Sequence, residues 1–312
     1  MKVLFIDTVH PILEEQLRAH GMECTPGYGW SREQILREVG SFQGIVIRSR
    51  TRIDAPFFEA AHALKWIARS GSGLENIDLT AAQRHGVMVF NSPEGNAQAV
   101  GEHATGMLLN LLNRISLSDA EVRRGVWLRE ENRGRELNAM RVGLIGYGHT
   151  GKAFAKCLSG FGCEVWAYDK YLNNYSDAFA TQQPLHTLCE HCDVISFHVP
   201  LTAETRHMLN TDFLNQCKDG VIIINTSRGK VCNTEDLVAA MKGGKVFGAC
   251  LDVHEYETAS FESLGFENIP APMAYLLQSQ RTVLTPHVAG WTVESYTKLS
   301  EYLAKKILAQ FS

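Results

Sequence analysis

VGLIGYGHTGKAFAKCLSGFGCEVWAYD, residues 142–169, is the stretch of this chain that decides its fold. An apolar run meets Gly146, Gly148 and Gly151 in the spacing G-x-G-x-x-G, and a helix-forming segment and a second apolar run follow. Gly146 permits a tight turn, Gly148 lets the backbone approach a pyrophosphate, and Gly151 lets the helix pack close to the strand. The order strand, glycine turn, helix, strand predicts a dinucleotide-binding unit.

The second apolar run ends in Asp169, 23 positions after Gly146 (169 − 146). A carboxylate there can accept hydrogen bonds from the hydroxyls of an adenine ribose and would repel a 2′-phosphate. The helix N-terminus offers free N–H groups to the phosphates. We therefore expect NAD as the cofactor rather than NADP, although Lys170, next to Asp169, could soften that preference.

The composition describes an ordinary globular protein. The chain has 312 residues, enough for two domains, with 45% hydrophobic and 21% charged residues and a net charge of −4. No global positive field draws it to nucleic acid or to a membrane, and no apolar run approaches the roughly 20 residues that span a bilayer. The N-terminal stretch reads as a strand and a helix rather than a signal peptide, so we expect a cytoplasmic protein with no nucleic-acid or membrane partner.

Strand and helix patterns alternate along the chain. The first ninety residues contain four short apolar runs that predict parallel strands: Val3–Asp7, Gly44–Ile47, Trp66–Arg69 and Val87–Phe90. A long helix, Ala97–Gly125, and a charged loop follow, and then strands near 142–145, 164–168, 193–197, 221–225 and 246–250.

A final helix, Val293–Gln310, is too short to be a domain and is expected to return to the first one. The predicted fold class is α/β, with two Rossmann-like or flavodoxin-like doubly wound parallel-sheet domains joined by two crossings with a cleft between them. The predicted domains are a substrate-binding domain of residues 1–96 plus 286–312 and an NAD-binding Rossmann domain of residues 97–285.

Eight cysteines are present at a density too low for a disulfide framework. Cys189 and Cys192 form a C-x-x-C with His191 between them, but no second pair completes the four ligands of a closed zinc site. We interpret this motif as a helix end and expect no metal.

Polar clusters follow three apolar runs of the second domain, where ligands bind in sheets of this kind. Arg228, in Asn225–Gly229, can form bidentate hydrogen bonds with a carboxylate or a keto oxygen. Asp252–Glu257 is the second cluster, and Thr285–Trp291, with His287, is the third. A histidine paired with a carboxylate is held in one tautomer and made a better base.

With these motifs in place, the sequence resembles the D-isomer-specific 2-hydroxyacid dehydrogenases over essentially its whole length, and most closely their phosphoglycerate dehydrogenase branch. The residues that carry the resemblance are Gly71–Asp78, the glycine turn, His198–Thr202, Asn225–Gly229, Asp252 with Glu257, and Thr285–Gly290. The resemblance implies an NAD-dependent oxidoreductase that transfers hydride to or from C2 of a D-2-hydroxy acid.

The resemblance also implies a role for each matching residue. The catalytic residues are Arg228, which binds the substrate's carboxyl and keto oxygens, His287, the acid and base, and Glu257, its partner. The backbone N–H groups of Ser72, Gly73 and Leu74 are expected to hold the substrate carboxylate. The expected cofactor-binding residues are Gly146, Gly148, His149, Thr150, Gly151, Asp169, Val199, Thr205, Thr226, Ser227, Asp252, Ala289 and Gly290.

The substrate is less sharply defined by the sequence. Arg48 and Arg50, in a loop after a predicted strand, match the phosphoglycerate branch and could bind a substrate phosphate, although a solvated basic loop remains an alternative. Our first interpretation is 3-phosphoglycerate dehydrogenase of serine biosynthesis, in a short form without a C-terminal regulatory domain. The alternatives are a reductase of glyoxylate, hydroxypyruvate or another small 2-keto acid, and a non-catalytic NAD-sensing corepressor.

Two further expectations concern the molecule's surface. The 30 positions between Glu257 and His287 (287 − 257) hold an insertion, with a short helix at Ala271–Leu277, that could alter substrate choice. The resemblance implies a homodimer built largely through the cofactor domain and the Ala97–Gly125 helix.

Overall fold

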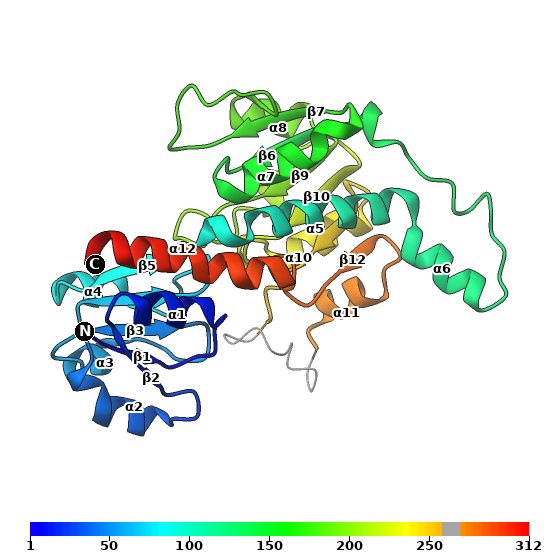
Figure 1. Cartoon of the computed structure of the whole chain (residues 1–312). Coiled ribbons are helices and arrows are strands. Elements are labelled where there is room, and N and C mark those ends of the chain that lie inside the picture. Colours follow the sequence, from blue (N-terminus) through cyan, green and yellow to red (C-terminus); the bar gives the residue numbers. More distant parts are fainter. Residues whose placement is uncertain (258–268, 312) are drawn as a thin grey trace. The chain divides into compact units, whose positions relative to one another are not determined.

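The protein folds into two compact units in this computed structural model, which describes residues 1–257 and 269–311 (Figure 1). Unit 1 consists of Met1–Ala97 and Trp291–Ser312, and unit 2 consists of Gln98–Gly290. Both are α/β units with parallel sheets, which confirms the predicted fold class.

The described residues of unit 1 form a five-stranded parallel sheet in the order β2-β1-β3-β4-β5. Its strands are β1 (Lys2–Phe5), β2 (Glu23–Pro26), β3 (Gly44–Ile47), β4 (Trp66–Arg69) and β5 (Met88–Asn91). Its helices are α1 (Ile12–Ala19), α2 (Arg32–Glu38), α3 (Ala55–Ala60), α4 (Leu79–Arg84), the start of α5 (Pro93–Asn113) and α12 (Val293–Phe311).

Alternation along β1 divides the unit 1 core into two layers. Val3 and Phe5 face α1 and α12, while Leu4 and Ile6 face the side that α2, α3 and α4 cover. Side chains that alternate between the faces of a buried strand place both faces in contact with helices. In Figure 1 the red helix α12 accordingly lies beside the blue helix α1.

The described residues of unit 2 form a seven-stranded parallel sheet in the order β12-β11-β10-β9-β6-β7-β8. Its strands are β6 (Arg141–Ile145), β7 (Glu164–Tyr168), β8 (Thr181–Gln182), β9 (Val194–Phe197), β10 (Val221–Asn225), β11 (Val246–Leu251) and β12 (Thr282–Leu284). Its helices are the rest of α5, α6 (Ile115–Arg123), α7 (His149–Leu158), α8 (Leu185–His191), α9 (Thr211–Gln216), α10 (Thr234–Lys242) and α11 (Ala271–Gln278).

The central strand β10 shows why this sheet is covered on both faces. Val221 and Ile223 join the apolar cluster under α8, α9, α10 and α11, whereas Ile222 and Ile224 join the cluster under α5 and α7. The strand is apolar throughout because neither face meets water.

One predicted helix is corrected by the structure. The expected helix Ala97–Gly125 is two helices, α5 and α6, which separate at Arg114, where the backbone has a φ of 53°. Asn110 closes the break, since its side chain accepts a hydrogen bond from the Ser116 amide at 2.8 Å and donates one to the Ser116 hydroxyl at 2.9 Å. Because the helix turns off here, α6 extends away from the sheet of unit 2 (Figure 1).

The boundaries of the units lie close to those expected for the domains. One falls inside α5, and the other falls between Gly290 and Trp291. We expected the return to the first domain at residue 286, but residues 286–290 lie in unit 2 because the amides of His287, Val288 and Ala289 all donate to Asp252.

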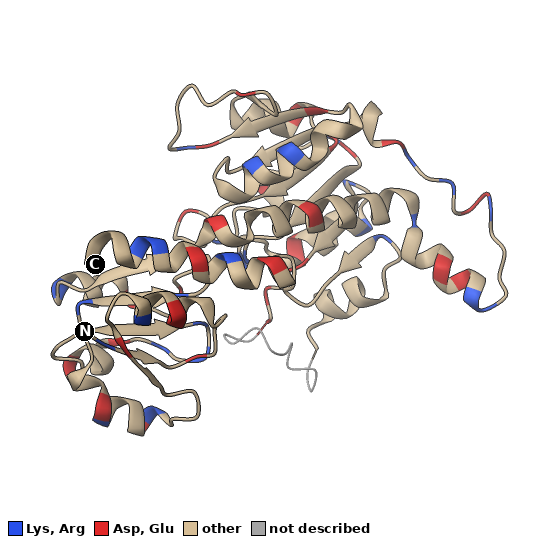
Figure 2. Ribbon diagram, viewed as in Figure 1, with Lys and Arg blue, Asp and Glu red and all other residues tan. Residues whose placement is uncertain are grey.

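Charge is mixed over the surface. Figure 2 shows Lys and Arg interspersed with Asp and Glu along the helices of both units. None of the helices in the described part of the chain has the length and apolar character needed to cross a bilayer.

Candidate active site

The glycine turn follows β6 and leads into α7. Gly146 has a φ of +94°, and a Cβ there would overlap the His198 carbonyl group, while a Cβ at Gly151 would overlap the Gly146 carbonyl oxygen. A Cβ at Gly148 would meet no atom within 4 Å, and Gly148 caps α7 without a side-chain hydrogen bond. Two glycines are therefore required by the fold, and the third leaves open space at a helix N-terminus, which suits a phosphate.

Asp169 follows β7, and its carboxylate accepts hydrogen bonds from backbone amides. Its Oδ2 accepts from the Tyr147 amide at 2.9 Å, and its Oδ1 accepts from the amides of Tyr171 at 2.9 Å and Leu172 at 3.2 Å. A carboxylate has about four lone-pair positions, so one on Oδ2 remains for a ribose hydroxyl. The adjacent Lys170 donates to Glu204 at 2.7 Å.

The other residues expected on this side of the cofactor have mixed surroundings. His149 and Thr150 lie in the first turn of α7. Val199 lies beside the glycine turn, because a Cβ at Gly146 would be 3.0 Å from its Cγ1 atom. The Thr205 hydroxyl donates to the Pro200 carbonyl at 2.6 Å and accepts from the Thr202 amide at 2.8 Å, so it holds its own loop together.

The turn after β10 is fixed by Asn225. Its Oδ1 accepts from the amide and hydroxyl of Ser227, and its Nδ2 donates to the Arg228 carbonyl at 2.9 Å. The hydroxyl of Thr226 is buried and has no hydrogen-bond partner among the described residues. A buried hydroxyl without a partner can form a hydrogen bond with a ligand atom, which agrees with the expected place of Thr226 on the nicotinamide side of the site.

Arg228 is held against the loop that leads to Glu257. A Cβ at the next residue, Gly229, would overlap the His254 carbonyl, so only glycine lets the two backbones approach this closely. The Arg228 guanidinium donates to the Ser227 carbonyl at 2.6 Å.

His287 and Glu257 are brought together although 30 positions separate them (287 − 257). His287 Nδ1 lies 3.2 Å from Glu257 Oε2. A carboxylate only accepts, so Nδ1 carries a proton and Nε2 is the ring atom that can exchange one with a ligand. The His287 backbone has a φ of 56°, a left-handed conformation that costs a residue with a Cβ on the order of 1 kcal/mol.

Asp252 holds that backbone in place. It is 1% exposed, and its Oδ1 accepts from the Val288 amide at 2.9 Å and its Oδ2 from the Ala289 amide at 2.8 Å. Its own carbonyl accepts from the His287 amide at 2.7 Å. The residue expected to contact the cofactor thus also builds the loop of the candidate acid and base.

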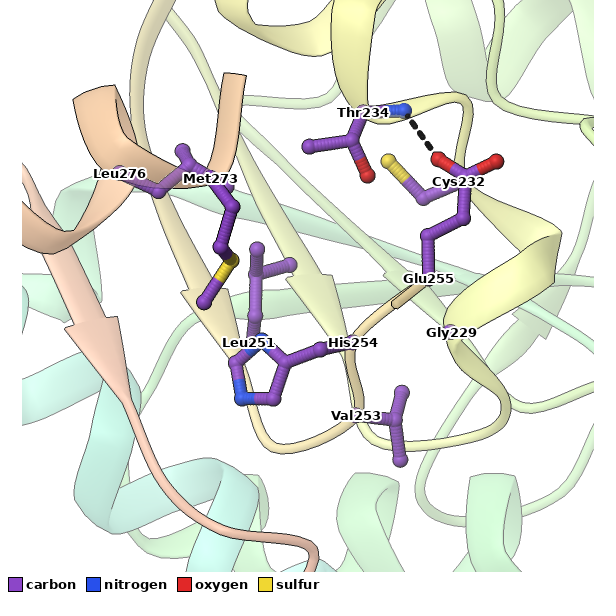
Figure 3. A pocket seen from close by; sticks show the side chains of 9 residues that line it. All are labelled: Gly229, Cys232, Thr234, Leu251, Val253, His254, Glu255, Met273 and Leu276. Carbon is purple, nitrogen blue, oxygen red and sulfur yellow. Dashed lines mark hydrogen bonds between the residues drawn. The ribbon is translucent and has the colours of Figure 1, made fainter. Parts of the chain in front are cut away.

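A small pocket lies behind this loop, between the ends of β10 and β11 and the helices α10 and α11 (Figure 3). It is lined by Gly229, Cys232, Thr234, Leu251, Val253, His254, Glu255, Met273 and Leu276. The dashed line in Figure 3 is the bond from the Thr234 amide to Glu255, at 2.8 Å, and the other oxygen of Glu255 lies 2.7 Å from His207 Nε2. Glu255 is therefore an anchor of the loop between Asp252 and Glu257.

Unit 1 holds the remaining predicted residues, which follow β3 and β4. Arg50 donates to Asp7 Oδ1 at 2.9 Å and to the Ile6 carbonyl at 2.6 Å. Arg48 lies 4.2 Å from the Trp291 ring, and burial lowers the pKa of its guanidinium. In the part of the chain that the structure describes, the Arg48 guanidinium has no hydrogen bond or ion pair, so of the two arginines it is the one available to an anion.

The segment of Ser72, Gly73 and Leu74 follows β4 in the same unit. The Ser72 hydroxyl donates to Asn96 Oδ1 at 2.7 Å, and its carbonyl accepts from Asn91 at 2.6 Å. Asn76, just beyond, donates to the carbonyls of Arg48 and Thr51 at 3.0 Å and so joins this loop to the arginine loop.

The C-x-x-C motif lies in the core of unit 2. Cys189 and Cys192 are buried under the apolar side chains of α8 and α9, and burial raises the pKa of Cys192 to about 12. Within residues 1–257 and 269–311 no group of three or more His, Cys, Asp or Glu side chains could hold a metal ion. The expected insertion lies partly in residues 258–268, outside the described residues, and α11 occupies the place of its predicted short helix.

Sequence reasoning missed His103 and the roles of Thr285 and Glu255. His103 Nε2 lies 3.0 Å from the Thr285 hydroxyl, which donates to Asp252 Oδ1 at 2.6 Å. Thr285 directly precedes Pro286 and His287 in a cluster that was singled out, but the spacing from His103 gave no signal of contact.

Comparison with known proteins places this geometry in a family. Residues 105–289 match the model of the D-isomer specific 2-hydroxyacid dehydrogenase, NAD binding domain. The chain is 35% identical to a D-3-phosphoglycerate dehydrogenase of Archaeoglobus fulgidus over 310 residues, 99% of this chain and 57% of that protein. It therefore spans little more than half the length of this relative.

Two shorter relatives match along most of both chains. A hydroxypyruvate reductase of Thermotoga maritima is 35% identical over 89% of this chain and 88% of its own. The crystal structure of a D-lactate dehydrogenase from Aquifex aeolicus, in complex with NAD and lactic acid, has a TM-score of 0.83 and 27% identity over 99% of this chain and 95% of that one.

Proposed function

Because this chain belongs to the D-isomer specific 2-hydroxyacid dehydrogenase family, we propose that it interconverts a 2-hydroxy acid and the corresponding 2-keto acid with NAD. The observation that carries the proposal is the His287–Glu257 pair, 3.2 Å apart, on a loop that Asp252 holds in a left-handed conformation. Residues 105–289 form the NAD-binding domain of the family.

The residues fit a bound dinucleotide. The open space at Gly148 and the uncapped N-terminus of α7 suit its pyrophosphate, and the buried hydroxyl of Thr226 offers a polar atom to its other end. When bound, NAD supplies the acceptor for the hydride that leaves C2 of the substrate, and NADH supplies the donor for the reverse reaction.

His287 handles the proton. In oxidation its neutral Nε2 removes the proton of the 2-hydroxyl, and in reduction the protonated ring returns it. Glu257 accepts a hydrogen bond from Nδ1 in both directions of the reaction, so the neutral ring keeps the tautomer in which Nε2 is unprotonated. When the ring is protonated, the carboxylate stabilises the imidazolium.

Arg228 orients the substrate. Its planar guanidinium can bind the carboxylate and the C2 oxygen of a 2-hydroxy acid together, and a fixed positive charge beside that oxygen stabilises the charge that develops there. The amides of Ser72, Gly73 and Leu74 are proposed to bind the carboxylate from unit 1.

For the substrate we propose 3-phosphoglycerate, as in serine biosynthesis, with hydroxypyruvate or glyoxylate as the alternative. Arg48 supports an anionic substituent, because its half-buried guanidinium forms no hydrogen bond or ion pair with a described residue, although the charge of Asp7 acts on it, whereas Arg50 forms an ion pair with Asp7. The likeness to a phosphoglycerate dehydrogenase favours the phosphorylated substrate, and the likeness to a hydroxypyruvate reductase favours the alternative.

Reduced-nicotinamide absorbance tests the proposal. The protein should reduce NAD with 3-phosphoglycerate or oxidise NADH with hydroxypyruvate or glyoxylate, and His287→Asn should lower kcat by about 10²–10⁴-fold with little change in NADH binding. Tight NAD binding without turnover of any of these acids would refute the enzymatic proposal and favour the corepressor interpretation.

Arg48→Ala then separates the substrates. For a phosphorylated substrate we expect KM to rise by about 10-fold or more, with a much smaller effect on an unphosphorylated acid. Arg52→Ala, at an exposed position of the same loop, is the matched control and should leave both KM values near those of the wild type. Equal effects of Arg48→Ala on both substrates would contradict the phosphate assignment.

We also propose that the molecule is a homodimer. The surface of α6 and the segment after it carries exposed apolar side chains: Ile115, Val122, Val126, Trp127 and Leu128. The indole of Trp127 is 79% exposed. Apolar side chains gathered on a projecting element are typical of a protein–protein interface.

A further inference from the structure

We propose that His103, on α5, is a positioning residue for the acid–base step, acting on His287 through Thr285 and Asp252. The inference rests on the proposed function, since it concerns the same histidine. It assigns a role to a side chain that neither touches the reacting atoms nor belongs to the predicted site. All four residues lie in unit 2.

The backbone of His287 has a left-handed conformation. Its φ of 56° turns the peptide groups so that successive N–H groups point to one side. Three of them, at 287, 288 and 289, donate to Asp252, the first to its carbonyl and the other two to its carboxylate. Consecutive amides that converge on an anion form a nest, and the conformation persists only while the anion stays in it.

Asp252 presents a buried carboxylate to this loop. A carboxylate that is 1% exposed needs hydrogen bonds to remain charged. Two come from the nest, and the third comes from the Thr285 hydroxyl at 2.6 Å. The orientation of the carboxylate, and hence the direction in which the nest faces, depends on that third bond.

The direction of each hydrogen bond follows from the protons that Thr285 and His103 carry. The Thr285 hydroxyl has one proton and gives it to Asp252, so towards His103 it can only accept. His103 Nε2 must therefore carry a proton and donate it to Thr285 at 3.0 Å, and the same nitrogen lies 3.6 Å from Asp252 Oδ1. His103 therefore donates to Thr285, and Thr285 donates to Asp252. The amides of Val288 and Ala289 also donate to the Asp252 carboxylate.

Thr285 is held by its backbone as well. Its carbonyl lies 3.0 Å from His254 Nε2, and its amide donates to the Leu251 carbonyl at 3.1 Å. The backbone bonds place the residue, and the bond from His103 sets the rotation of its hydroxyl. Removal of the His103 donor lets that hydroxyl turn, which loosens Asp252 and the loop that aims the His287 ring at its substrate.

The test is a pair of substitutions at residue 103. His103→Ala should lower kcat about 10- to 100-fold, because misplacement of a catalytic group by about 1 Å has an effect of that size, while the Kd of NADH, to which Asp252 also contributes, changes by a smaller factor than kcat. His103→Gln keeps an N–H donor at the ε position and should recover most of kcat. Loss of folding alone would lower kcat and NADH affinity together and would not produce this recovery.

A second pair tests the route. Thr285→Val removes the hydroxyl at constant shape and should match His103→Ala, Thr285→Ser should keep most of kcat, and the double variant should be no worse than either single one. Wild-type kcat in His103→Ala, a loss that His103→Gln does not recover, additive losses in the double variant, or a parallel loss of NADH affinity would each overturn the inference.

A measurement without turnover separates this inference from the proposed function. The ¹⁵N shifts of the His287 ring report its tautomer, which should be the Nδ1–H form in the wild type and a mixture of both forms in His103→Ala. An unchanged tautomer in His103→Ala would overturn the positioning role. Absence of turnover in the wild type would refute the proposed function and leave the tautomer result standing.

Discussion

Lys170 stands beside Asp169, and its ammonium group lies 2.7 Å from Glu204, which also accepts a hydrogen bond from the Tyr171 hydroxyl at 3.0 Å. This ion pair raises the pKa of Lys170 and lowers that of Glu204. A lysine next to the carboxylate that is proposed to bind the ribose would favour a 2′-phosphate, but here its ammonium group is paired with Glu204. Glu204 thus supports the proposed preference for NAD from outside the cofactor motif.

Substitution of Glu204 tests this reading. Glu204→Gln should raise the ratio of kcat/KM for NADPH to that for NADH by up to about 5-fold, the range of an exposed ion pair. Glu164→Gln is a matched control, because Glu164 forms an equally short bond with Arg141 at the opposite end of β7. An unchanged ratio in Glu204→Gln would show that Lys170 does not reach the 2′ position.

At the scale of residues, the sequence predicted side chains whose chemistry is visible in their own neighbourhood. Arg228, His287 and the glycine turn each follow an apolar run that ends at the same sheet edge. His103 was missed because its partner, Thr285, lies 182 positions later and a histidine inside a helix gives no local signal. The engagement of Arg50 by Asp7 was missed for the same reason, since an ion pair between two strand ends depends on their register.

At the scale of elements, α5 begins in close contact with α12. A Cβ at Gly95 would lie 2.7 Å from the Leu299 backbone, closer than any side chain can sit against a helix. Gly95→Ala should therefore lower the free energy of unfolding by about 1–3 kcal/mol, since the two helices must move apart.

Chemical denaturation of matched variants checks this expectation. Gly160→Ala is the control, because a Cβ at Gly160 meets no atom within 4 Å, and it should leave the unfolding midpoint nearly unchanged. Similar midpoints for the two variants would mean that α12 tolerates displacement from α5.

The sequence predicted buried strands better than edges and helix breaks. The runs of β9, β10 and β11 are apolar because both faces are covered, so their pattern is plain. The edge strands β2 and β8 were not predicted, since one reads ECTP and the other has two exposed residues. No glycine or proline marks the break at Arg114, where side-chain bonds from Asn110 stabilise the turn instead.

At the scale of the whole molecule, assembly is testable. Trp127→Asp should convert a dimer to a monomer or weaken its association by at least about 30-fold, because a buried aromatic anchor of an interface contributes on the order of 2 kcal/mol or more. Sedimentation equilibrium measures the association constant. Trp291→Asp is the comparison, since Trp291 is 50% exposed and lies in the other unit. A monomeric wild type would contradict the proposal directly.

Acid stability of the whole protein should depend on His198. Burial lowers its pKa to about 3, against about 6.5 in the unfolded chain. Above pH 6.5 both states are neutral and the stability is complete. As the pH falls towards 3 the unfolded chain takes up a proton that the folded protein does not, so stability is lost.

Urea unfolding at pH 7 and pH 5 measures the effect. The wild type should lose about 2 kcal/mol more than His198→Gln between these two values. A variant that loses as much as the wild type would place the acid sensitivity elsewhere, for example in the carboxylates.

Because α12 packs on the sheet of unit 1 but follows unit 2 in the sequence, the core of unit 1 can be completed only late in synthesis. One face of the β1–β3–β4 layer is closed by Leu303, Ala304 and Ile307 of α12, which the ribosome adds only after the entire second unit. Translation usually lets the earlier half settle first. The side chains that pack against α12 on this face, among them Phe5 and Trp66, therefore stay without that cover until the whole of unit 2 has been synthesised.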